Sequence, residues 1–117
     1  MKPILRPIMI VDSVKRPNKH MTPQQEKEFH HWCNEVHAPD LLKGTGMTSV
    51  TRYRDRDGNG YITVQEFESE EVLEKYLVGE RRKELTKETQ THYPAGPEDF
   101  FDRKVRIFIP IFTTACK

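Results

Sequence analysis

The sequence predicts a single α+β domain whose elements follow the order β-α-β-β-α-β. Three observations lead to this prediction: short runs rich in β-branched residues, two segments with helical spacing of apolar residues, and a tight-turn sequence between two of the runs. The chain has 117 residues, the length of one ordinary domain. Residues 1–117 are therefore expected to share one hydrophobic core.

The first part of the chain predicts a strand and the start of a helix. The apolar run Ile8–Val11 indicates a buried strand, and the polar residues 15–21 indicate a loop. A helix should follow Thr22, because Thr22 and Gln25 have the spacing of a capping box and Pro23 suits the first helical turn.

The apolar face of this helix is set by a spacing of three and four residues, which Phe29, Trp32, Cys33 and Val36 satisfy. Pro39 restricts the residue before it, so the regular helix should end near His37. At 100° per residue, His30 and His37 fall together at the edge of the apolar face.

The middle of the chain predicts a hairpin. Residues 47–54 and 61–67 are rich in strand-forming residues, and the Asp-Gly and Asn-Gly pairs of 55–60 favour a tight turn between them. Ser69 should cap a second helix, which Gly79 interrupts and which continues to about Thr91. Residues 92–97 contain two prolines and indicate a loop.

The last strand is predicted over residues 105–112, where Val105, Ile107, Ile109 and Ile111 alternate with other residues. Pro110 suggests an edge or a bulge. The complete order is that of the ferredoxin-like fold. Because both faces of the last strand carry apolar residues, we expect helices to cover one face of the sheet and a second copy of the chain to cover the other.

Composition excludes several classes of function. The formal net charge is +1, with acids and bases interleaved, so the basic face typical of a nucleic-acid-binding protein is not expected. No apolar segment is long enough to span a membrane. The two cysteines, Cys33 and Cys116, form no disulfide or zinc pattern, and the N-terminal residues lead into a strand rather than a signal peptide. We therefore expect a cytoplasmic protein.

A motif spanning residues 32–68 resembles a known family. Trp32 is followed by His37-Ala38-Pro39, then by Gly46, by Arg52-Tyr53, and by a strand ending near Glu66. This order is similar to the EthD-like branch of the dimeric α+β barrel superfamily. Thr45-Gly46 stands where many relatives have Pro-Gly.

The resemblance implies a homodimer with a pocket between helices and sheet in each subunit. The superfamily contains polyketide cyclases and dehydratases, muconolactone isomerases, cofactor-free monooxygenases and haem-degrading enzymes, as well as members with no known activity. It therefore implies no single reaction, and the function has to be argued from the site.

His37 is the candidate catalytic residue. An imidazole can take and give a proton near neutral pH, as enolisation, dehydration and ring closure require. Its place at the edge of the apolar face lets it reach a pocket, and it matches the His-x-Pro of the resembled family. The alternative is a structural histidine that bonds a backbone carbonyl at the helix end.

Four further residues are candidate binding residues: Trp32, His30, Tyr53 and Glu66. Tyr53 could orient a substrate oxygen, and Glu66 could act as a base or hold a histidine. The alternatives are core packing for Tyr53 and an ion pair with Arg52 for Glu66. Trp32 would form a core or pocket wall. The histidine spacing does not favour a transition-metal site.

Residues 55–66 also match the twelve-residue EF-hand pattern, with oxygen ligands from Asp55 to Glu66 and Gly60 at the turn. An EF-hand needs a helix before its loop, whereas residues 44–54 contain two glycines and several β-branched residues. Calcium binding is kept as a distant alternative, and the prediction is that no metal and no cofactor are bound.

Two functions remain. The first is a small cofactor-independent enzyme of the lyase, isomerase or cyclase type, in which His37 performs acid–base catalysis on a small hydrophobic carbonyl or aromatic compound. The second is a non-catalytic dimeric barrel that binds a hydrophobic small molecule. A pocket with His37 pointing into it would favour the first.

Overall fold

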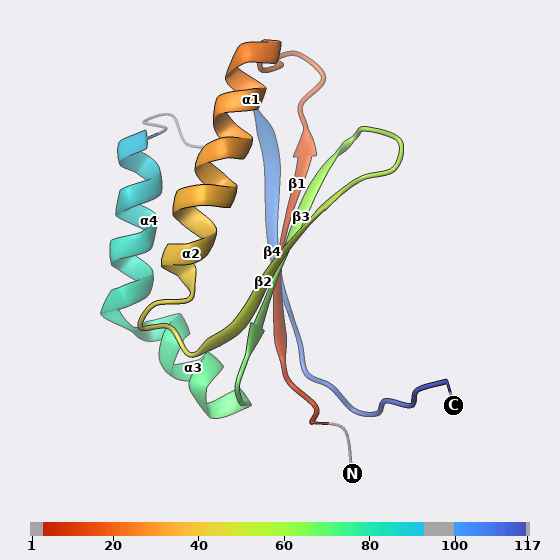
Figure 1. The fold of residues 1–117 in the computed structure, drawn as a ribbon, viewed down its shortest axis with the longest axis vertical. Coiled ribbons are helices and arrows are strands. Elements are labelled where there is room, and N and C mark those ends of the chain that lie inside the picture. Colours follow the sequence, from red (N-terminus) through yellow and green to blue (C-terminus); the bar gives the residue numbers. More distant parts are fainter. Residues whose placement is uncertain (1–3, 93–99, 117) are drawn as a thin grey trace.

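The computed structural model describes residues 4–92 and 100–116 of the chain. Its elements follow the predicted order, with each helical region divided into shorter segments (Figure 1). The strands are β1 (Ile8–Lys15), β2 (Met47–Arg54), β3 (Gly60–Phe67) and β4 (Phe101–Phe108). The helical segments are α1 (Pro23–Trp32), η1 (Cys33–His37), α2 (Ala38–Leu41), α3 (Glu70–Val78) and α4 (Glu80–His92).

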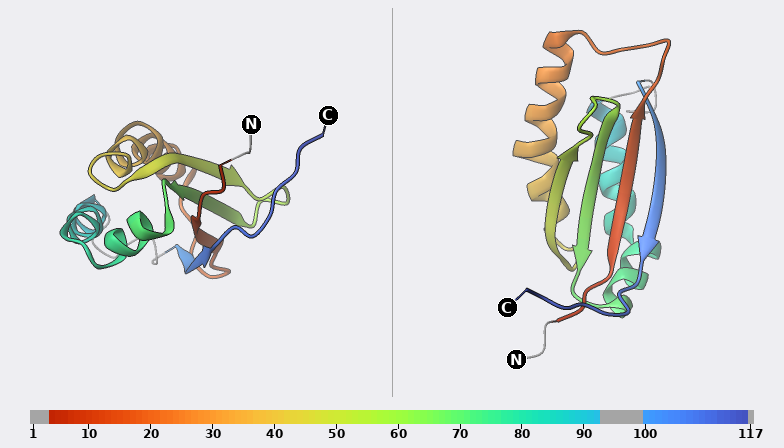
Figure 2. Two further views of the ribbon diagram at one scale, coloured as in Figure 1. Left: turned by 90° about the horizontal axis from the view of Figure 1, so that it is seen from below. Right: turned by 90° about the vertical axis from the view of Figure 1, so that its right-hand side faces the viewer.

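The four strands form one antiparallel sheet in the order β2-β3-β1-β4. Within residues 4–92 and 100–116, the helices all lie on one face of this sheet and none covers the opposite face (Figures 1 and 2). The predicted ferredoxin-like α+β fold is thus confirmed. None of the helices within the described residues is both long and apolar enough to cross a membrane.

The first helical region begins as predicted. The Thr22 side chain accepts a hydrogen bond from the backbone N–H of Gln25, and the Gln25 side chain accepts one from the Thr22 N–H. This reciprocal pair is a capping box, and it satisfies two of the N–H groups that a helix start leaves without partners.

The end of this region differs from the prediction, because the helix does not stop before Pro39 but continues to Leu41. Residues Cys33–His37 form a π-helical turn, in which the Ala38 N–H donates to the Cys33 carbonyl five residues earlier. In an α-helix the proline ring would clash with the carbonyl four residues before it. The wider turn shifts the hydrogen-bond pattern at this point, so Pro39 enters the first turn of α2.

The hairpin and the second helical region match the prediction. The Asp55 carboxylate accepts hydrogen bonds from the backbone N–H groups of Asp57 and Asn59, which closes the turn between β2 and β3. Ser69 caps α3 through the Val72 N–H, and Gly79 separates α3 from α4. Apart from His92, which ends α4, the loop predicted over 92–97 lies outside the described residues.

The last strand was predicted over 105–112, and this was wrong by about four residues, because β4 is Phe101–Phe108. Its register with β1 pairs Lys15 with Phe101 and Ile8 with Phe108, so β1 offers no partner beyond Phe108. Pro110 lacks the N–H that a further ladder bond would need. Residues 109–116 leave the sheet instead, and Ile111 is 94% exposed.

Most of the core lies between the helices and the covered face of the sheet. The main cluster consists of Met9, Leu41, Met47, Phe67, Leu73, Tyr76 and Leu85. A second cluster contains Phe29, Trp32, Cys33 and Phe101. The helical face predicted from spacing is therefore largely buried, whereas Val36 is 38% exposed because the π-turn rotates it away from the core.

The turn before β2 depends on one glycine. Gly46 has a φ of 77°, in the left-handed region that favours glycine, and a Cβ added there would overlap Cγ1 of Val72. Gly58 in the hairpin has a φ of 81°, but a Cβ added there would have open space around it. The two glycines thus share a backbone constraint and differ in packing.

We expect Gly46→Ala to lower the free energy of unfolding more than Gly58→Ala does. The left-handed backbone should cost each variant about 1–2 kcal/mol, and the overlap with Val72 should add about 1–3 kcal/mol at Gly46 only. Urea denaturation of both variants measures the difference. Equal losses in the two variants would contradict the packing seen around Gly46.

Candidate functional site

A cavity of about 200 Å³ lies between the helical layer and the covered face of the sheet. The sheet contributes alternate residues to it, among them Val11, Ser13, Thr63, Gln65 and Val105. The first helical region contributes Phe29, Trp32, Cys33, His37 and Leu41, and α4 contributes Leu85, Thr86, Thr89 and Gln90. The walls are thus apolar near the first helix and more polar along the strands and α4.

His37 lies in the wall of this cavity. Its ring stacks on Trp32, with 4.7 Å between the ring centroids and 13° between the planes. Burial, together with the positive charge of Arg103, lowers the pKa of His37 from 6.5 to about 4. The imidazole is therefore neutral at pH 7. Its Nδ1 atom is buried and has no hydrogen-bond partner among the described residues.

The π-turn determines where this histidine lies. Cys33 and His37 are the first and last residues of η1, and both line the cavity. Regular helical spacing would have put His30 and His37 side by side, and this expectation was wrong. The extra residue in the turn separates them: His37 stacks on Trp32, whereas His30 contacts Tyr61 and Arg52.

A chain of hydrogen bonds runs along one side of the cavity. Glu26 accepts from the Tyr61 hydroxyl at 2.5 Å, and the same hydroxyl lies 3.0 Å from Nε2 of His30. Nη2 of Arg52 lies 3.1 Å from Nδ1 of His30, and Nη1 of Arg52 donates to Oδ1 of Asn34 at 2.6 Å. The chain therefore joins α1 and η1 to β2 and β3.

The donors in this chain determine the tautomer of His30. A guanidinium can only donate, so Nδ1 of His30 must accept from Arg52 and carries no proton. The Tyr61 proton is directed to Glu26, so Nε2–H of His30 donates to the Tyr61 oxygen. His30 is thus a neutral imidazole with both nitrogens in use, and it holds Arg52 rather than serving as a free base.

The pKa values of these groups agree with this pattern. The hydrogen bond from Tyr61 lowers the pKa of Glu26 and keeps it ionised. Burial and the same hydrogen bond raise the pKa of Tyr61 to about 12. Burial, followed by the charge of Arg52, lowers the pKa of His30. At pH 7 the chain consists of a carboxylate, a phenol, a neutral imidazole and a guanidinium.

Cys33 also lines the cavity, but it is not an activated nucleophile. Burial raises the pKa of its thiol, which keeps the sulfur protonated at neutral pH. Cys33 is a free thiol, and Cys116 is exposed in the C-terminal segment. Gln65 is 5% exposed, and its Oε1 atom has no hydrogen-bond partner among the described residues. It therefore offers an acceptor at the cavity floor.

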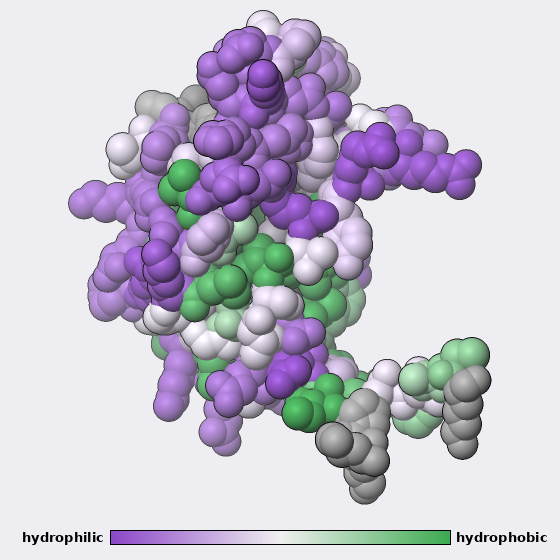
Figure 3. All heavy atoms as spheres, viewed as in Figure 1, coloured by the Kyte–Doolittle hydropathy of each residue, from purple (hydrophilic) through white to green (hydrophobic). Residues whose placement is uncertain are grey.

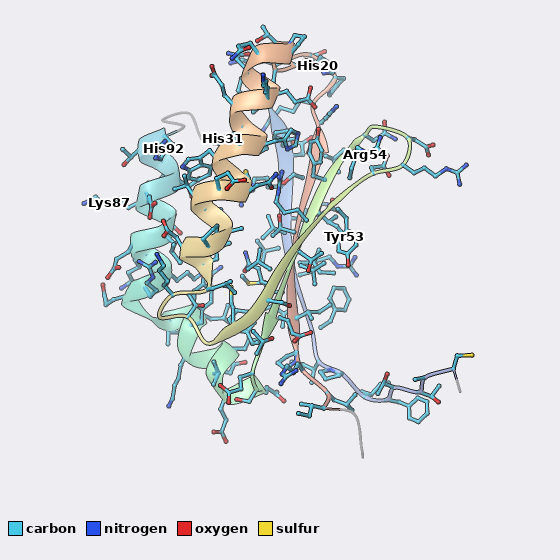
Figure 4. The ribbon with its side chains drawn as sticks, viewed as in Figure 1. His20, His31, Tyr53, Arg54, Lys87 and His92 are labelled. Atoms are coloured by element: carbon cyan, nitrogen blue, oxygen red, sulfur yellow. The ribbon has the colours of Figure 1, made fainter. Side chains whose placement is uncertain are left out.

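The predicted binding residues are only partly brought together. Trp32 and His37 both line the cavity, and His30 bonds to two lining residues. Tyr53 and Glu66 lie on the opposite face of the sheet, because residues on a strand alternate between faces and their neighbours Arg52 and Gln65 line the cavity. Tyr53 is 53% exposed on that face (Figure 4).

Glu66 has structural partners there. Its carboxylate accepts a hydrogen bond from Thr48 at 2.6 Å and lies 3.6 Å from Nη1 of Arg6. Arg52, the ion-pair partner expected from the sequence, points to the other face. Neither Tyr53 nor Glu66 therefore reaches the cavity within this chain.

The EF-hand pattern of residues 55–66 is part of the β2–β3 hairpin. Asp55 closes the turn, whereas Glu66 lies near the far end of β3. The extended strand from Gly60 to Glu66 spans roughly 20 Å. The ligand set cannot converge in this arrangement, since an EF-hand needs Asp55 and Glu66 on one ion. Within the described part of the chain, no group of three His, Cys, Asp or Glu side chains is placed to hold a metal.

Sequence reasoning missed several residues of the site. Arg52 was noted only in the family motif and as a partner for Glu66, and Tyr61, Thr63 and Gln65 only as part of a strand and of the EF-hand pattern. The alternation of the last three along β3 was the available signal, because it puts them on one face. His92, at the end of α4, lies beside Trp32, with ring centroids 5.0 Å apart (Figure 4).

The buried neutral His37 predicts a specific dependence of stability on pH. The unfolded chain takes up this proton near pH 6.5, and the folded protein only near pH 4. The neutral His37 imidazole makes its full contribution to the free energy of unfolding above pH 6.5, and this contribution is lost as the pH falls from 6.5 to about 4. We expect His37→Gln to lose less stability than the wild type between pH 7 and pH 4, by at most roughly 3 kcal/mol.

Urea denaturation at both pH values measures this difference. His31→Gln is the matched control, because His31 is exposed on α1 (Figure 4). Parallel pH dependence of the wild type and His37→Gln would show that the His37 imidazole is not held in its neutral form by the fold.

Comparisons with known proteins show which solved structures share this fold. No protein-family model and no curated protein sequence matches the chain. Solved structures do match. A monooxygenase from the gene ActVA-Orf6 of Streptomyces coelicolor, in complex with nanaomycin D, is 14% identical with a TM-score of 0.65, covering 97% of this chain and 94% of that one.

Two more structures extend the comparison. SnoaB, a cofactor-independent oxygenase from Streptomyces nogalater, is 14% identical with a TM-score of 0.61, covering 94% of this chain and 97% of its own. An ethyl tert-butyl ether (EthD) family protein from Bacillus halodurans is 14% identical with a TM-score of 0.57, and the match covers 90% of this chain and 99% of that one. The chain therefore shares the fold of these structures, in agreement with the element order predicted from its sequence.

Proposed function

We propose that the protein is a small enzyme that needs no cofactor and that catalyses proton transfer on a small, partly apolar carbonyl or aromatic compound. His37 is the proton-transfer group. The observation that carries the proposal is that His37 lines the cavity and that its buried Nδ1 atom has no hydrogen-bond partner among the described residues. A buried polar atom in such a position is available to a substrate.

The protonation state of His37 suits the role of a base. The neutral ring can accept a proton, although a pKa of about 4 makes it a weak base in the empty cavity. Removal of a proton from the substrate would leave a negative charge on the substrate. Arg52 and Arg103 line the same cavity, and their charges would stabilise that anion as it forms.

Several reaction classes share this proton-transfer step. An isomerase returns the proton to another carbon, a lyase expels a leaving group, and a cyclase uses the carbanion to close a ring. The volume of the cavity limits the size of the substrate, but it does not determine the reaction class. A cavity of 150 Å³ holds one benzene molecule, so about 200 Å³ suits a compound with a single ring.

Oxygenation is a second candidate, and it is favoured by the comparisons. Two of the structures with this fold are described as a monooxygenase and a cofactor-independent oxygenase. The electron-rich anion left by proton removal is also the species that would react with molecular oxygen. Oxygen consumption during turnover separates this reaction from isomerisation, elimination and ring closure.

Non-catalytic binding of a small apolar molecule is the remaining alternative. It would use the same cavity and the ring surfaces of Trp32 and Phe29, but it would not need His37 to change its protonation state. Loss of turnover in a His37 variant that still binds ligand therefore distinguishes the enzyme from the binding protein.

We expect the wild type to speed the exchange of α-protons for deuterium in single-ring ketones and keto acids, followed by NMR in deuterium oxide. His37→Gln should lose at least about a hundredfold of this rate, because a positioned base commonly contributes that much. His31→Gln, the exposed control, should keep the rate. Exchange that is unaffected in His37→Gln would remove His37 from the mechanism, and no acceleration with any compound would favour the binding protein.

We also propose that the protein works as a homodimer in which the uncovered faces of two sheets pack together. The apolar residues of that face are Ile8, Ile10, Val14, Tyr53, Ile62, Val64 and Phe108. Val14 is 46% exposed and Tyr53 is 53% exposed. Hydrophobic residues gather beside the strands and along the C-terminal segment, whereas the helices are mostly hydrophilic (Figure 3). Because the helices cover only the other face of the sheet, this apolar surface is exposed to water unless a second copy of the chain buries it.

We expect the wild type to sediment as a dimer at micromolar concentration. Tyr53→Asp should shift it toward the monomer, because an unpaired charge buried in an interface costs several kcal/mol. Lys87→Asp is the control, since Lys87 is exposed on the outer side of α4 (Figure 4). A wild-type monomer at this concentration would contradict the proposed dimer.

A further inference from the structure

The described lining of the cavity carries basic side chains and no acidic ones. Three arginines line it, Arg52, Arg82 and Arg103, and its described lining contains no aspartate or glutamate. A half-buried cation is usually paired with a carboxylate, because removing a charge from water is costly. A lining arginine that has no carboxylate partner therefore needs a physical reason.

Arg52 is the arginine for which this is clearest. None of the ion pairs among the described residues includes it. Its two hydrogen bonds go to neutral groups, the Asn34 amide oxygen and the unprotonated Nδ1 of His30. Five N–H groups belong to a guanidinium, so donors remain after these two bonds.

The surroundings hold this guanidinium in place without neutralising it. Its central carbon lies 5.8 Å from the ring centroid of Phe29 and 5.8 Å from that of Tyr61. Glu26 is the acidic residue of this hydrogen-bond chain, but it accepts from Tyr61 and lies 3.7 Å from Nζ of Lys15. The rings of His30 and Tyr61 separate it from Arg52 along the chain. Arg52 is thus a rigid, uncompensated donor on the cavity wall.

The other two arginines are less suited to this role. Arg82 donates to the Leu77 carbonyl and lies over the Tyr76 ring. Arg103 is exposed on the edge strand β4. They add positive potential to the cavity, whereas Arg52 has the fixed geometry that recognition of a planar anion requires.

We propose that the cavity binds a small planar carboxylate, with its carboxylate group on Arg52 and a single apolar ring against Phe29 and Trp32. This inference names the substrate class of the proposed enzyme and so rests on that proposed function for its biological meaning. The binding itself follows from the uncompensated guanidinium, the apolar wall and the volume of about 200 Å³.

Benzoate and benzamide form a matched pair of probes, because they share a shape and differ in charge. The chain contains a single tryptophan, and this residue, Trp32, lines the cavity, so its fluorescence reports binding. We expect the full-length wild type to bind benzoate at least about tenfold more tightly than benzamide, since hydrogen bonds to charged groups contribute about 1.5–3 kcal/mol.

Arg52→Gln should remove this preference, so that benzoate and benzamide bind the variant with similar affinity. Arg52→Lys keeps the charge but not the planar fork, and it should retain part of the preference. Arg54→Gln is the control: it lies on the same strand, is exposed, and does not line the cavity. Far-ultraviolet circular dichroism of each variant verifies the fold.

Equal affinity of the wild type for the two probes, or no binding of benzoate, would overturn the proposal. A preference for benzoate that persists in Arg52→Gln would also overturn it. The outcome is separate from that of the proton-transfer test. Benzoate binding that depends on Arg52, in a protein without α-proton exchange, would support the anion site and reject the enzyme.

Discussion

One backbone hydrogen bond organises the site: the Ala38 N–H donates to the Cys33 carbonyl and closes a π-turn instead of an α-turn. The wider turn lets the helix pass Pro39, which would otherwise end it. It also rotates the residues that follow, so Val36 leaves the core and the ring of His37 stacks on Trp32. Turns of this kind often occur at functional sites. Here the turn carries two of the residues that line the cavity.

The second constraint is the hydrogen-bond chain from Glu26 to Asn34. Each group in it has one assignable role, because the carboxylate only accepts and the guanidinium only donates. His30 is thereby kept neutral and occupied, and Arg52 is kept charged and still. His37 lines the cavity itself, and its buried Nδ1 atom has no hydrogen-bond partner among the described residues. The two histidines of α1 and η1 thus differ in role because their hydrogen bonds differ.

The sequence predicted the fold well, because local signals agreed with the tertiary structure: the capping box at Thr22, the turn at 55–60 and the serine cap of α3 are all present. It failed where tertiary pairing decided the outcome. The position of β4 depends on the register with β1, and its charged first half resembles a loop. His37 and Trp32 were found from helical spacing. Arg52 was not found in this way. The sequence shows an arginine on a strand, but it does not show whether a carboxylate will lie beside it.

The arginines that line the cavity affect how readily His37 accepts a proton. Burial is the larger cause of the low pKa of His37, and a bound ligand would not relieve it. The charges of Arg103 and Arg52 are the further causes that lower it, and these a bound anion can cancel. A carboxylate on Arg52 would therefore raise the pKa of His37 by reducing the positive potential around it.

Proton removal then creates a second negative charge on the substrate. An arginine that is already paired with the carboxylate would stabilise this second charge less strongly. A substrate that places its carboxylate on Arg52 and its developing charge toward Arg103 would avoid this conflict. Two cationic groups on different strands of the sheet can serve two charges in this way, whereas a single arginine could not.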